Sequence, residues 1–175
     1  MYYEIKTSRL LLRPLSINDL DSVHIYASDN DNTKFMFWLP NDTKEETAQF
    51  LLKVTDEWRK ESPSFYEFAN TLNNEQIGAI SITLNEEKNV GEFGWIINKQ
   101  YWKKGYATEA ALAIKDFAIK ELKVSKLIAT CDSRNSNSYK LMEKIGLGLE
   151  SDNGTRTYPK NGETAKELMY SLIIK

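Results

Sequence analysis

Cysteine and histidine are almost absent from this 175-residue sequence, which contains one of each. The single cysteine, Cys131, cannot form an intrachain disulfide, and that suits a reducing cytosol. Because Cys131 ends an apolar segment, we expect an inert core residue rather than a nucleophile. The single histidine, His24, lies in a polar early segment with no metal-ligand pattern around it. We therefore expect no metal site.

Membrane signals and a strong charge of one sign are also absent. No apolar run approaches the length of a membrane span, and the N-terminus has no charged-then-apolar signal pattern. The formal net charge is −2 and the pI is about 5.6, which gives no general attraction to nucleic acid or to an anionic membrane. We expect a cytoplasmic protein with neither kind of partner.

Length and composition fit one folded domain over residues 1–175. Hydrophobic residues make up 41% and charged residues 27%, as in ordinary globular chains. No internal repeat, low-complexity tract or linker divides the sequence. The composition leaves open whether the domain is a monomer or a homodimer.

Hydrophobic patterns in the first half predict mixed elements. We expect a strand within 3–15 that ends at Pro14, and a polar helix from a cap near Ser16 to Ala27. A turn-rich break then precedes a helix capped by Asp42 or Thr43. Three strands follow, over 65–71, 76–84 and 90–97, with a turn at Asn73-Asn74 between the first two.

The second half alternates helices and strands. A helix is expected over 106–122, and a short apolar strand over 127–131 that is covered on both faces. With the strand at 90–97 they form a βαβ unit, which predicts a parallel pair with a right-handed crossover. A helix over 135–145 ends at Gly146. Two last strands, near 148–158 and 165–174, join through Asn161-Gly162, a strong hairpin signal.

The most informative stretch is 91–111, GEFGWIINKQYWKKGYATEAA. An apolar strand runs into a short basic loop, and the loop opens into an alanine-rich helix. The first backbone N–H groups of a helix have no intrahelical partner, and the helix dipole favours an anion there. The loop lacks the second glycine and the Gly-Lys-Ser/Thr ending of a Walker loop, and the three spaced glycines of a dinucleotide site. The pattern still indicates a phosphate site.

This stretch resembles the pyrophosphate loop of GNAT-type N-acetyltransferases, usually Gln/Arg-x-x-Gly-x-Gly/Ala, with 102–107 in that register. Trp102 replaces the usual first residue, but Tyr101-Trp102 and the run after Gly105 look like the RimJ/RimL branch, named for ribosomal-protein N-terminal acetylation. The resemblance extends from Thr7 to about Ser171. It implies an α/β (α+β) fold of the acyl-CoA N-acyltransferase type, with a mixed central sheet of about seven strands flanked by about four helices.

The resemblance implies an enzyme that moves an acetyl group from acetyl-CoA, its cosubstrate, directly to a primary amine on a protein N-terminus or a small molecule. The cofactor's pyrophosphate would bind the backbone amides of the loop, which are those of Lys103, Lys104, Gly105, Tyr106, Ala107 and Thr108. In the alternative reading, Gly105 merely turns the chain and both lysines are solvated. The backbone of Ile96 and Ile97 would pair with the pantetheine arm, while their side chains pack in the core.

Asn135 and Ser138 match the family's Asn-x-x-Ser at the start of the second helix of this half. By that resemblance Asn135 would hydrogen-bond the cofactor, and Ser138 would lie beside its sulfur. Both residue types are also ordinary helix caps, a role compatible with catalysis. Many relatives carry a proton-donating tyrosine where this chain has Met142. Ser138 would then protonate the leaving thiolate, or Tyr139 would, or the thiolate would leave unprotonated.

Glu92 stands where the family often carries its general base. An amine is mostly protonated near neutral pH, and a carboxylate can take that proton directly or through water if burial raises its pKa. The alternative is a solvated strand glutamate. The acceptor itself has no motif, although several aromatic residues either line its pocket or belong to the core: Phe35, Phe37, Trp38, Trp58, Tyr66 and Trp95.

Two other functions remain open at this point. A catalytically silent acyl-CoA-binding sensor or subunit would keep the same fold and the same loop without turnover. A nucleotide-binding protein would use the loop on ATP, although the Walker lysine-serine/threonine pair and an obvious Mg²⁺ carboxylate are missing. Intact Glu92 and Ser138 favour the enzyme over the sensor.

Overall fold

The computed structural model describes residues 3–38 and 40–175, and within them the chain forms one eight-stranded mixed sheet. The strands lie in the order β1-β2-β3-β4-β5-β6-β8-β7. Their bounds are β1 Ile5–Lys6, β2 Leu11–Pro14, β3 Phe65–Leu72, β4 Glu75–Leu84, β5 Val90–Ile97, β6 Lys126–Asp132, β7 Gly148–Thr157 and β8 Thr164–Ile173.

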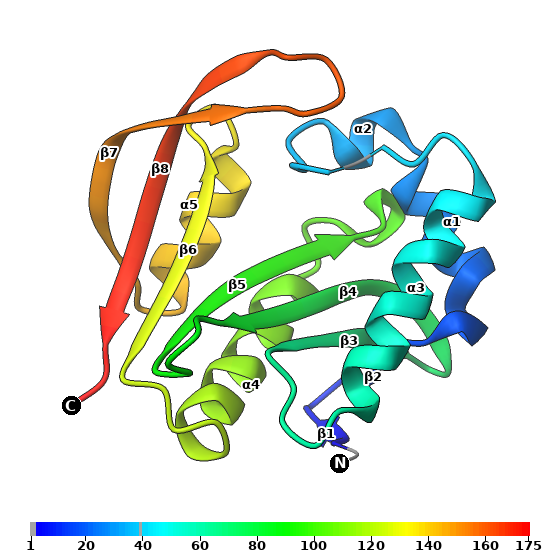
Figure 1. The fold of residues 1–175 in the computed structure, drawn as a ribbon, viewed down its shortest axis with the longest axis horizontal. Helices are drawn as coiled ribbons and strands as arrows, with labels where there is room; N and C mark the ends of the chain where they lie inside the picture. Colours follow the sequence, from blue (N-terminus) through cyan, green and yellow to red (C-terminus); the bar gives the residue numbers. More distant parts are fainter. Residues whose placement is uncertain (1–2, 39) are drawn as a thin grey trace.

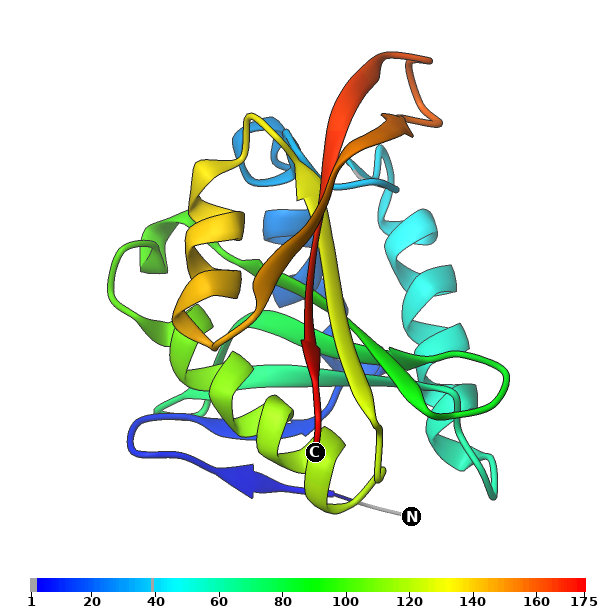
Figure 2. The ribbon, with the colours of Figure 1, turned by 90° about the vertical axis from the view of Figure 1, so that its left-hand side faces the viewer.

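Helices cover both faces of this sheet. Helices α4 and α5 lie on one side and α3 on the other, as Figure 2 shows. The helices are α1 Leu20–Ala27, α2 Asn30–Thr33, α3 Lys44–Arg59, α4 Tyr106–Lys120 and α5 Ser136–Lys144, with short 3₁₀ helices at Ile17–Asp19 and Lys99–Tyr101. Helix α4 buries an apolar stripe of residues at helical spacing between Ala110 and Ala118.

The central feature is the splay between β5 and β6. The two strands are parallel neighbours, as predicted, but they pair only at their starts, from Val90↔Lys126 to Glu92↔Ile128. Beyond Glu92 they diverge, and Figure 1 shows the opening between them. The backbone groups on that side of the rest of β5 therefore have no strand partner within the described residues.

The N-terminal segment differs from the expected single strand. It folds back at Thr7, whose N–H donates to the Leu10 carbonyl at 2.9 Å, so two short strands form instead of one. This turn adds the eighth strand. The expected break after Ala27 contains the short helix α2, because Asp29 caps it by accepting from the Asn32 N–H.

The other predicted boundaries are confirmed within a few residues. Thr43 rather than Asp42 caps α3, and Ser16 caps the first 3₁₀ helix. Asn73 and Asn74 both adopt positive φ in the β3–β4 turn. Asn161 and Gly162 lie in the loop that joins β7 to β8, with Gly162 at φ 70°.

The prediction that the strand at 127–131 is covered on both faces was wrong. Leu127, Ala129 and Cys131 are buried, but Ile128 and Thr130 between them are only partly buried. The sequence of this strand is mostly apolar, so it looked fully covered. The partly open face results from the divergence of β6 from β5, and that divergence depends on residues far away in the sequence.

Candidate active site

The splay continues into a cleft of about 1390 Å³. Its walls come from β5, the loop before α4, helix α5, the end of β7 and the segment 34–38. The cleft brings together every predicted site residue except Lys104: Glu92, Ile96, Ile97, Lys103, Gly105, Tyr106, Ala107, Thr108, Asn135 and Ser138. Residues far apart in the sequence therefore share one surface.

At one end of the cleft, the loop presents the uncapped start of α4. Gly105 is the N-cap residue at φ 82° and ψ 2°, and no side chain among the described residues caps the helix. This left-handed conformation suits glycine, since a Cβ is strained there. Lys103 also has a positive φ, 60°. The first N–H groups of α4 are thus left for a ligand, and the helix dipole favours an anion.

A polar network holds this loop from the β1–β2 turn. The Glu109 carboxylate of α4 accepts from the Thr7 and Ser8 hydroxyls, and from the backbone N–H and Nε of Arg9. Arg9 in turn donates to the Lys104 carbonyl at 2.9 Å and lies 4.5 Å from the centre of the Tyr106 ring. Burial raises the pKa of Glu109, but these hydrogen bonds outweigh it and lower the pKa to about 2.

The two loop lysines take different positions. Lys103 lines the cleft, whereas Lys104 places its ammonium 5.2 Å from the centre of the Tyr101 ring. Trp102, which replaces the usual Gln/Arg of the motif, donates from Nε1 to the Ile97 carbonyl at 2.7 Å. The tryptophan therefore ties the loop to the end of β5.

Residues 95–97 form the exposed edge of β5. The Asn98 N–H bonds to the Ile77 carbonyl of β4, and antiparallel strands alternate between bonded and non-bonded pairs. By that alternation the backbone groups of Ile96 point to β4, while those of Trp95 and Ile97 point into the splay. The Ile97 carbonyl already accepts from Asn32 and Trp102, so its N–H is the group left open.

Helix α5 begins against the cleft. Asn135 is its N-cap and accepts from the Ser138 N–H at 3.3 Å, so the capping role is confirmed. Ser138 is 8% exposed, and burial raises the pKa of the nearby Cys131 thiol. Cys131 is buried, as expected, but it also lines the cleft. Met142 is fully buried and cannot donate a proton.

Glu92 lies at the other end of the cleft, within a polar cluster that the sequence did not predict. Its Oε1 is 3.4 Å from the Thr130 hydroxyl on β6. Thr130 accepts from Arg156 of β7 at 3.1 Å, and Arg156 donates to Glu167 of β8 at 2.9 Å. Burial raises the pKa of Glu92, nearby Glu167 raises it further, and Thr130 and Arg156 oppose the rise. A partly buried carboxyl with a raised pKa fits a proton acceptor.

A second buried carboxyl occupies the same face of the sheet. Glu67 of β3 pairs with Ser81 of β4, which lines the cleft. Burial raises the pKa of Glu67 to about 8, so it is mostly protonated at neutral pH. Neither Glu67 nor the Thr130–Arg156–Glu167 cluster follows a local motif. Only the strand register brings these side chains together.

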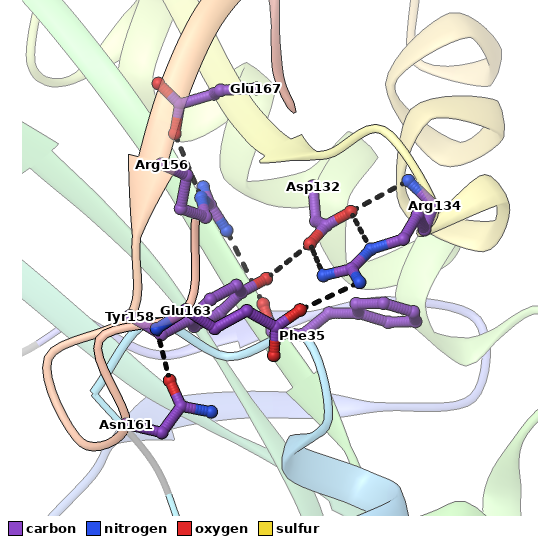
Figure 3. A network of polar contacts seen from close by, with 8 residues as sticks. All are labelled: Phe35, Asp132, Arg134, Arg156, Tyr158, Asn161, Glu163 and Glu167. Atoms are coloured by element: carbon purple, nitrogen blue, oxygen red, sulfur yellow. Dashed lines mark hydrogen bonds and ion pairs between the residues drawn. The ribbon is translucent and has the colours of Figure 1, made fainter. Parts of the chain in front are cut away.

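Above Glu92, the segment 34–38 forms an aromatic wall. Phe35, Phe37 and Trp38 line the cleft with Trp95, whereas Trp58 and Tyr66 belong to the core. Next to this wall, the buried Asp132 at the end of β6 accepts from Arg134, whose guanidinium lies 5.9 Å from the centre of the Phe35 ring, and from the Tyr158 hydroxyl after β7 (Figure 3). Burial opposes them, but these bonds lower the pKa of Asp132 to about 2.

Metal clusters and long apolar helices are both missing from the part of the chain that the structure describes. No cluster of three or more histidine, cysteine, aspartate or glutamate side chains is arranged there to hold a metal ion. Across the same residues, no helix combines the length and the apolar character needed to cross a membrane.

A family model described as an acetyltransferase (GNAT) domain matches residues 9–148. The uncharacterized N-acetyltransferase YnaD of Bacillus subtilis (strain 168) is 32% identical over 171 residues, covering 97% of this chain and 96% of YnaD. The spermidine N(1)-acetyltransferase of Escherichia coli (strain K12) is 28% identical over 144 residues, covering 81% of this chain and 74% of that protein.

Among solved structures, a GNAT-family acetyltransferase from Bacillus anthracis superposes with a TM-score of 0.84 at 33% identity. The match covers 98% of each chain. The mixed sheet described above, with its helices on both faces, is therefore the acetyltransferase fold that the resemblance implied.

Proposed function

This chain belongs to the GNAT acetyltransferase family and is an acyltransferase, and on that premise we propose that it transfers acetyl from acetyl-CoA directly to a primary amine, with Glu92 as general base. The proposal includes one acetyltransferase domain over 1–175 in the cytoplasm. The observation that carries it is that one cleft joins the N-terminus of α4 to a partly buried carboxyl with a raised pKa.

The residues present fit acetyl-CoA, which supplies the thioester. The open N–H groups at the start of α4 suit its pyrophosphate, and Lys103 adds a charge there. The free edge of β5 suits the amide-containing pantetheine arm, and the register favours Trp95 and Ile97 over Ile96 for this role. On α5, Lys140 and Lys144 line the cleft one helical turn apart and suit a further phosphate.

Glu92 would take the proton from the acceptor ammonium, directly or through one water. The amine must be neutral to attack the thioester carbonyl, and a typical alkyl ammonium is a weak acid with a pKa near 10. A carboxylate whose own pKa is raised is a better acceptor for that proton than an ordinary glutamate. Burial raises the pKa of Glu92, which is the direction that this role requires.

Ser138 would stabilise the departing thiolate. Its buried hydroxyl lines the cleft at the start of α5, where the helix dipole also favours negative charge. Met142 leaves no tyrosine at the position of the family's usual donor. Replacing Ser138 with alanine should slow turnover, and raising the pH should not restore it, because the serine acts on the thiolate rather than on the amine.

The acceptor class is best supported as a cationic amine next to aromatic surface. Phe35, Phe37 and Trp38 surround the approach to Glu92, and aromatic faces attract alkylammonium groups. A panel should therefore compare spermidine and other alkylamines with peptides carrying free N-termini, which the RimJ/RimL likeness favours. Release of free thiol from acetyl-CoA would measure turnover.

The sensor alternative predicts binding without turnover. Tight coenzyme A binding with no thiol release on any amine would support it and contradict the enzyme. Turnover that survives simultaneous replacement of Glu92 and Ser138 would instead contradict their proposed roles. Titrating coenzyme A and ATP in parallel tests the nucleotide alternative, which requires ATP to bind at least as tightly.

A further inference from the structure

Arg156 is a buried arginine at the base end of the cleft to which neither the family motifs nor the proposed chemistry assigns a role. Its side chain is 9% exposed. The guanidinium donates to Glu167 Oε2 at 2.9 Å, to the Phe35 carbonyl at 3.4 Å and to Thr130 Oγ1 at 3.1 Å. Figure 3 shows it between Glu167 and Phe35, near the end of β7.

These contacts determine the direction of the next hydrogen bond. A guanidinium has only donors, so the Thr130 oxygen must be the acceptor in its contact with Arg156. Because a carboxylate has only acceptors, the single hydroxyl hydrogen of Thr130 is donated to Glu92 Oε1, at 3.4 Å. By donating to the same hydroxyl oxygen, Arg156 orients the hydroxyl so that its hydrogen faces the carboxylate.

We propose that Arg156 is a positioning residue for the general base: through Thr130 it holds one oxygen of Glu92 and leaves the other for the acceptor amine. The proposal rests on the role of Glu92 proposed above. It makes Arg156 act on the reaction without contact with either substrate. Its bond to the Phe35 carbonyl also ties the base to the aromatic wall of the acceptor end.

The charges around Glu92 give this arrangement a measurable consequence. The Thr130 hydrogen bond favours the charged carboxylate, and Arg156 adds a nearby positive charge, so both restrain the rise in pKa that burial causes. Glu167 of β8 acts in the opposite direction. On β4, Ser81 and Thr83 are uncharged, and Glu67 of β3 is mostly protonated near neutral pH. Lys34, in the segment 34–38, places its ammonium over the Phe35 ring.

The test measures the pH dependence of kcat/KM in variants of Thr130 and Arg156. Thr130→Val removes the hydroxyl at almost constant shape and so removes a hydrogen bond that favours the charged form of Glu92. The acidic limb of the kcat/KM profile, where activity falls as Glu92 is protonated, should therefore move up by about one pH unit, the size expected for a hydrogen bond to a charged group. Thr130→Ser keeps the hydroxyl and should keep the parent limb. Arg156→Met should move the limb in the same direction and also raise the acceptor KM several-fold, because the Phe35 tie is lost.

Thr83→Val is the matched control. Thr83 pairs with Glu92 across β4 and β5 on the same face, whereas the side-chain hydrogen bond of Glu92 goes to Thr130. The same substitution at Thr83 should leave the acidic limb in place. The carboxyl of Glu92 should also be titrated directly, by carbon NMR of glutamate-labelled protein assigned with Glu92→Gln, since this readout needs no turnover. If Thr130→Val does not fold, Thr130→Ala removes the same hydroxyl.

The outcomes separate this inference from the proposed function. A Glu92→Gln enzyme with the parent's rate would overturn the base and the positioning role together. The positioning role alone would be overturned by two results together: Glu92→Gln is slow, but the acidic limb of the kcat/KM profile is the same in the parent, Thr130→Val and Arg156→Met. A limb that also moves in Thr83→Val would show a general effect of the cleft's polarity, and would likewise overturn it.

Discussion

At the α4 end of the cleft, the chain presents backbone groups from consecutive residues, 103–108, on a loop whose shape is set by positive φ at Lys103 and Gly105. At the Glu92 end, four side chains arrive from four strands: Glu92, Thr130, Arg156 and Glu167. The backbone shape of the first region is local, although the β1–β2 turn holds it in place, whereas the second region is assembled entirely by strand register. Substitutions should therefore separate the cofactor binding proposed for the first region from the proton transfer proposed for the second.

The largest expected effect comes from Glu92→Gln, which keeps the shape and removes the basicity. Turnover should fall by about 10²–10⁴, the usual contribution of a general base. Coenzyme A affinity should stay at the parent's value because the loop is untouched. Raising the pH should restore part of the rate, since more amine is then already neutral. Steady-state kinetics from neutral to alkaline pH would measure both effects.

A matching loss of coenzyme A affinity in Glu92→Gln would break the separation. It would mean that the base end also shapes the cofactor site. Normal turnover at neutral pH would remove Glu92 from the role of base.

Gly105→Val should produce the opposite pattern. At φ 82° a side chain is strained, and a Cβ would lie 3.4 Å from Arg9 Nη2. Backbone strain at the first turn of α4, and a side chain where the pyrophosphate would approach the backbone, should weaken coenzyme A binding at least tenfold, which corresponds to about 1.4 kcal/mol. Calorimetric titration of the folded variant would measure this.

Gly162→Val supplies the matched control for that variant. Gly162 also has a positive φ, 70°, but in its hairpin loop no atom of the described residues, apart from its chain neighbours, lies within 4 Å of the position that a Cβ would occupy. The variant should carry similar backbone strain and keep coenzyme A affinity. Equal loss of affinity in both variants would attribute the effect to general destabilisation.

The difference between the two regions also explains what sequence reasoning could find. The glycine before α4 and the Asn135 cap are local signals, so they were predicted at the right residues, and the cap of α3 was narrowed to Asp42 or Thr43, of which Thr43 is the one. Thr130 and Arg156 carry no such signal, because their roles arise from the pairing of β6 with β8 and β8 with β7. A threonine inside an apolar strand is the one hint that the strand has an open face.

The β1–β2 turn illustrates the same limit. Thr7, Ser8 and Arg9 were part of the resemblance, but their function there had no local explanation. In the structure they converge on Glu109, about one hundred residues along the chain. The single strand expected over 3–15 could not form, because the turn that binds Glu109 interrupts it.

Glu109→Gln should produce a smaller effect that links stability to cofactor binding. The pKa of Glu109 is lowered to about 2 from 4.5, so its charged form stabilises the fold above about pH 4.5, and this contribution is lost as the pH falls toward 2. The free energy of unfolding of the variant should be lower by about 1–3 kcal/mol at neutral pH. It should also fall less than the parent's as the pH decreases from about 4.5 to 2. Coenzyme A should bind roughly threefold to tenfold more weakly, because charge-assisted bonds that hold Arg9 on the Lys104 carbonyl are weakened.

Glu57→Gln controls for stability alone. Glu57 on α3 also has a lowered pKa and accepts from the Ser64 N–H, but it lies outside the cleft. It should destabilise the fold without changing coenzyme A affinity. Denaturant unfolding from pH 2 to 7 and calorimetry would test the pair. Unchanged affinity in Glu109→Gln would mean that the loop keeps its shape without the network.

The smallest expected effect distinguishes the two loop lysines. Lys103 lines the cleft, whereas Lys104 lies against the Tyr101 ring. An exposed charge near a phosphate contributes only modestly, so Lys103→Ala should weaken coenzyme A binding about threefold. Added salt screens the attraction between Lys103 and the phosphate in the parent. The variant lacks that attraction, so its affinity should decline less steeply with added salt. Lys104→Ala should keep the parent's salt dependence. Equal slopes in all three proteins would mean that neither ammonium contributes and that the backbone alone holds the anion. If only Lys104→Ala shows a weaker salt dependence, Lys104 rather than Lys103 contributes the charge that attracts the phosphate. The loop would then have to rearrange when the cofactor binds.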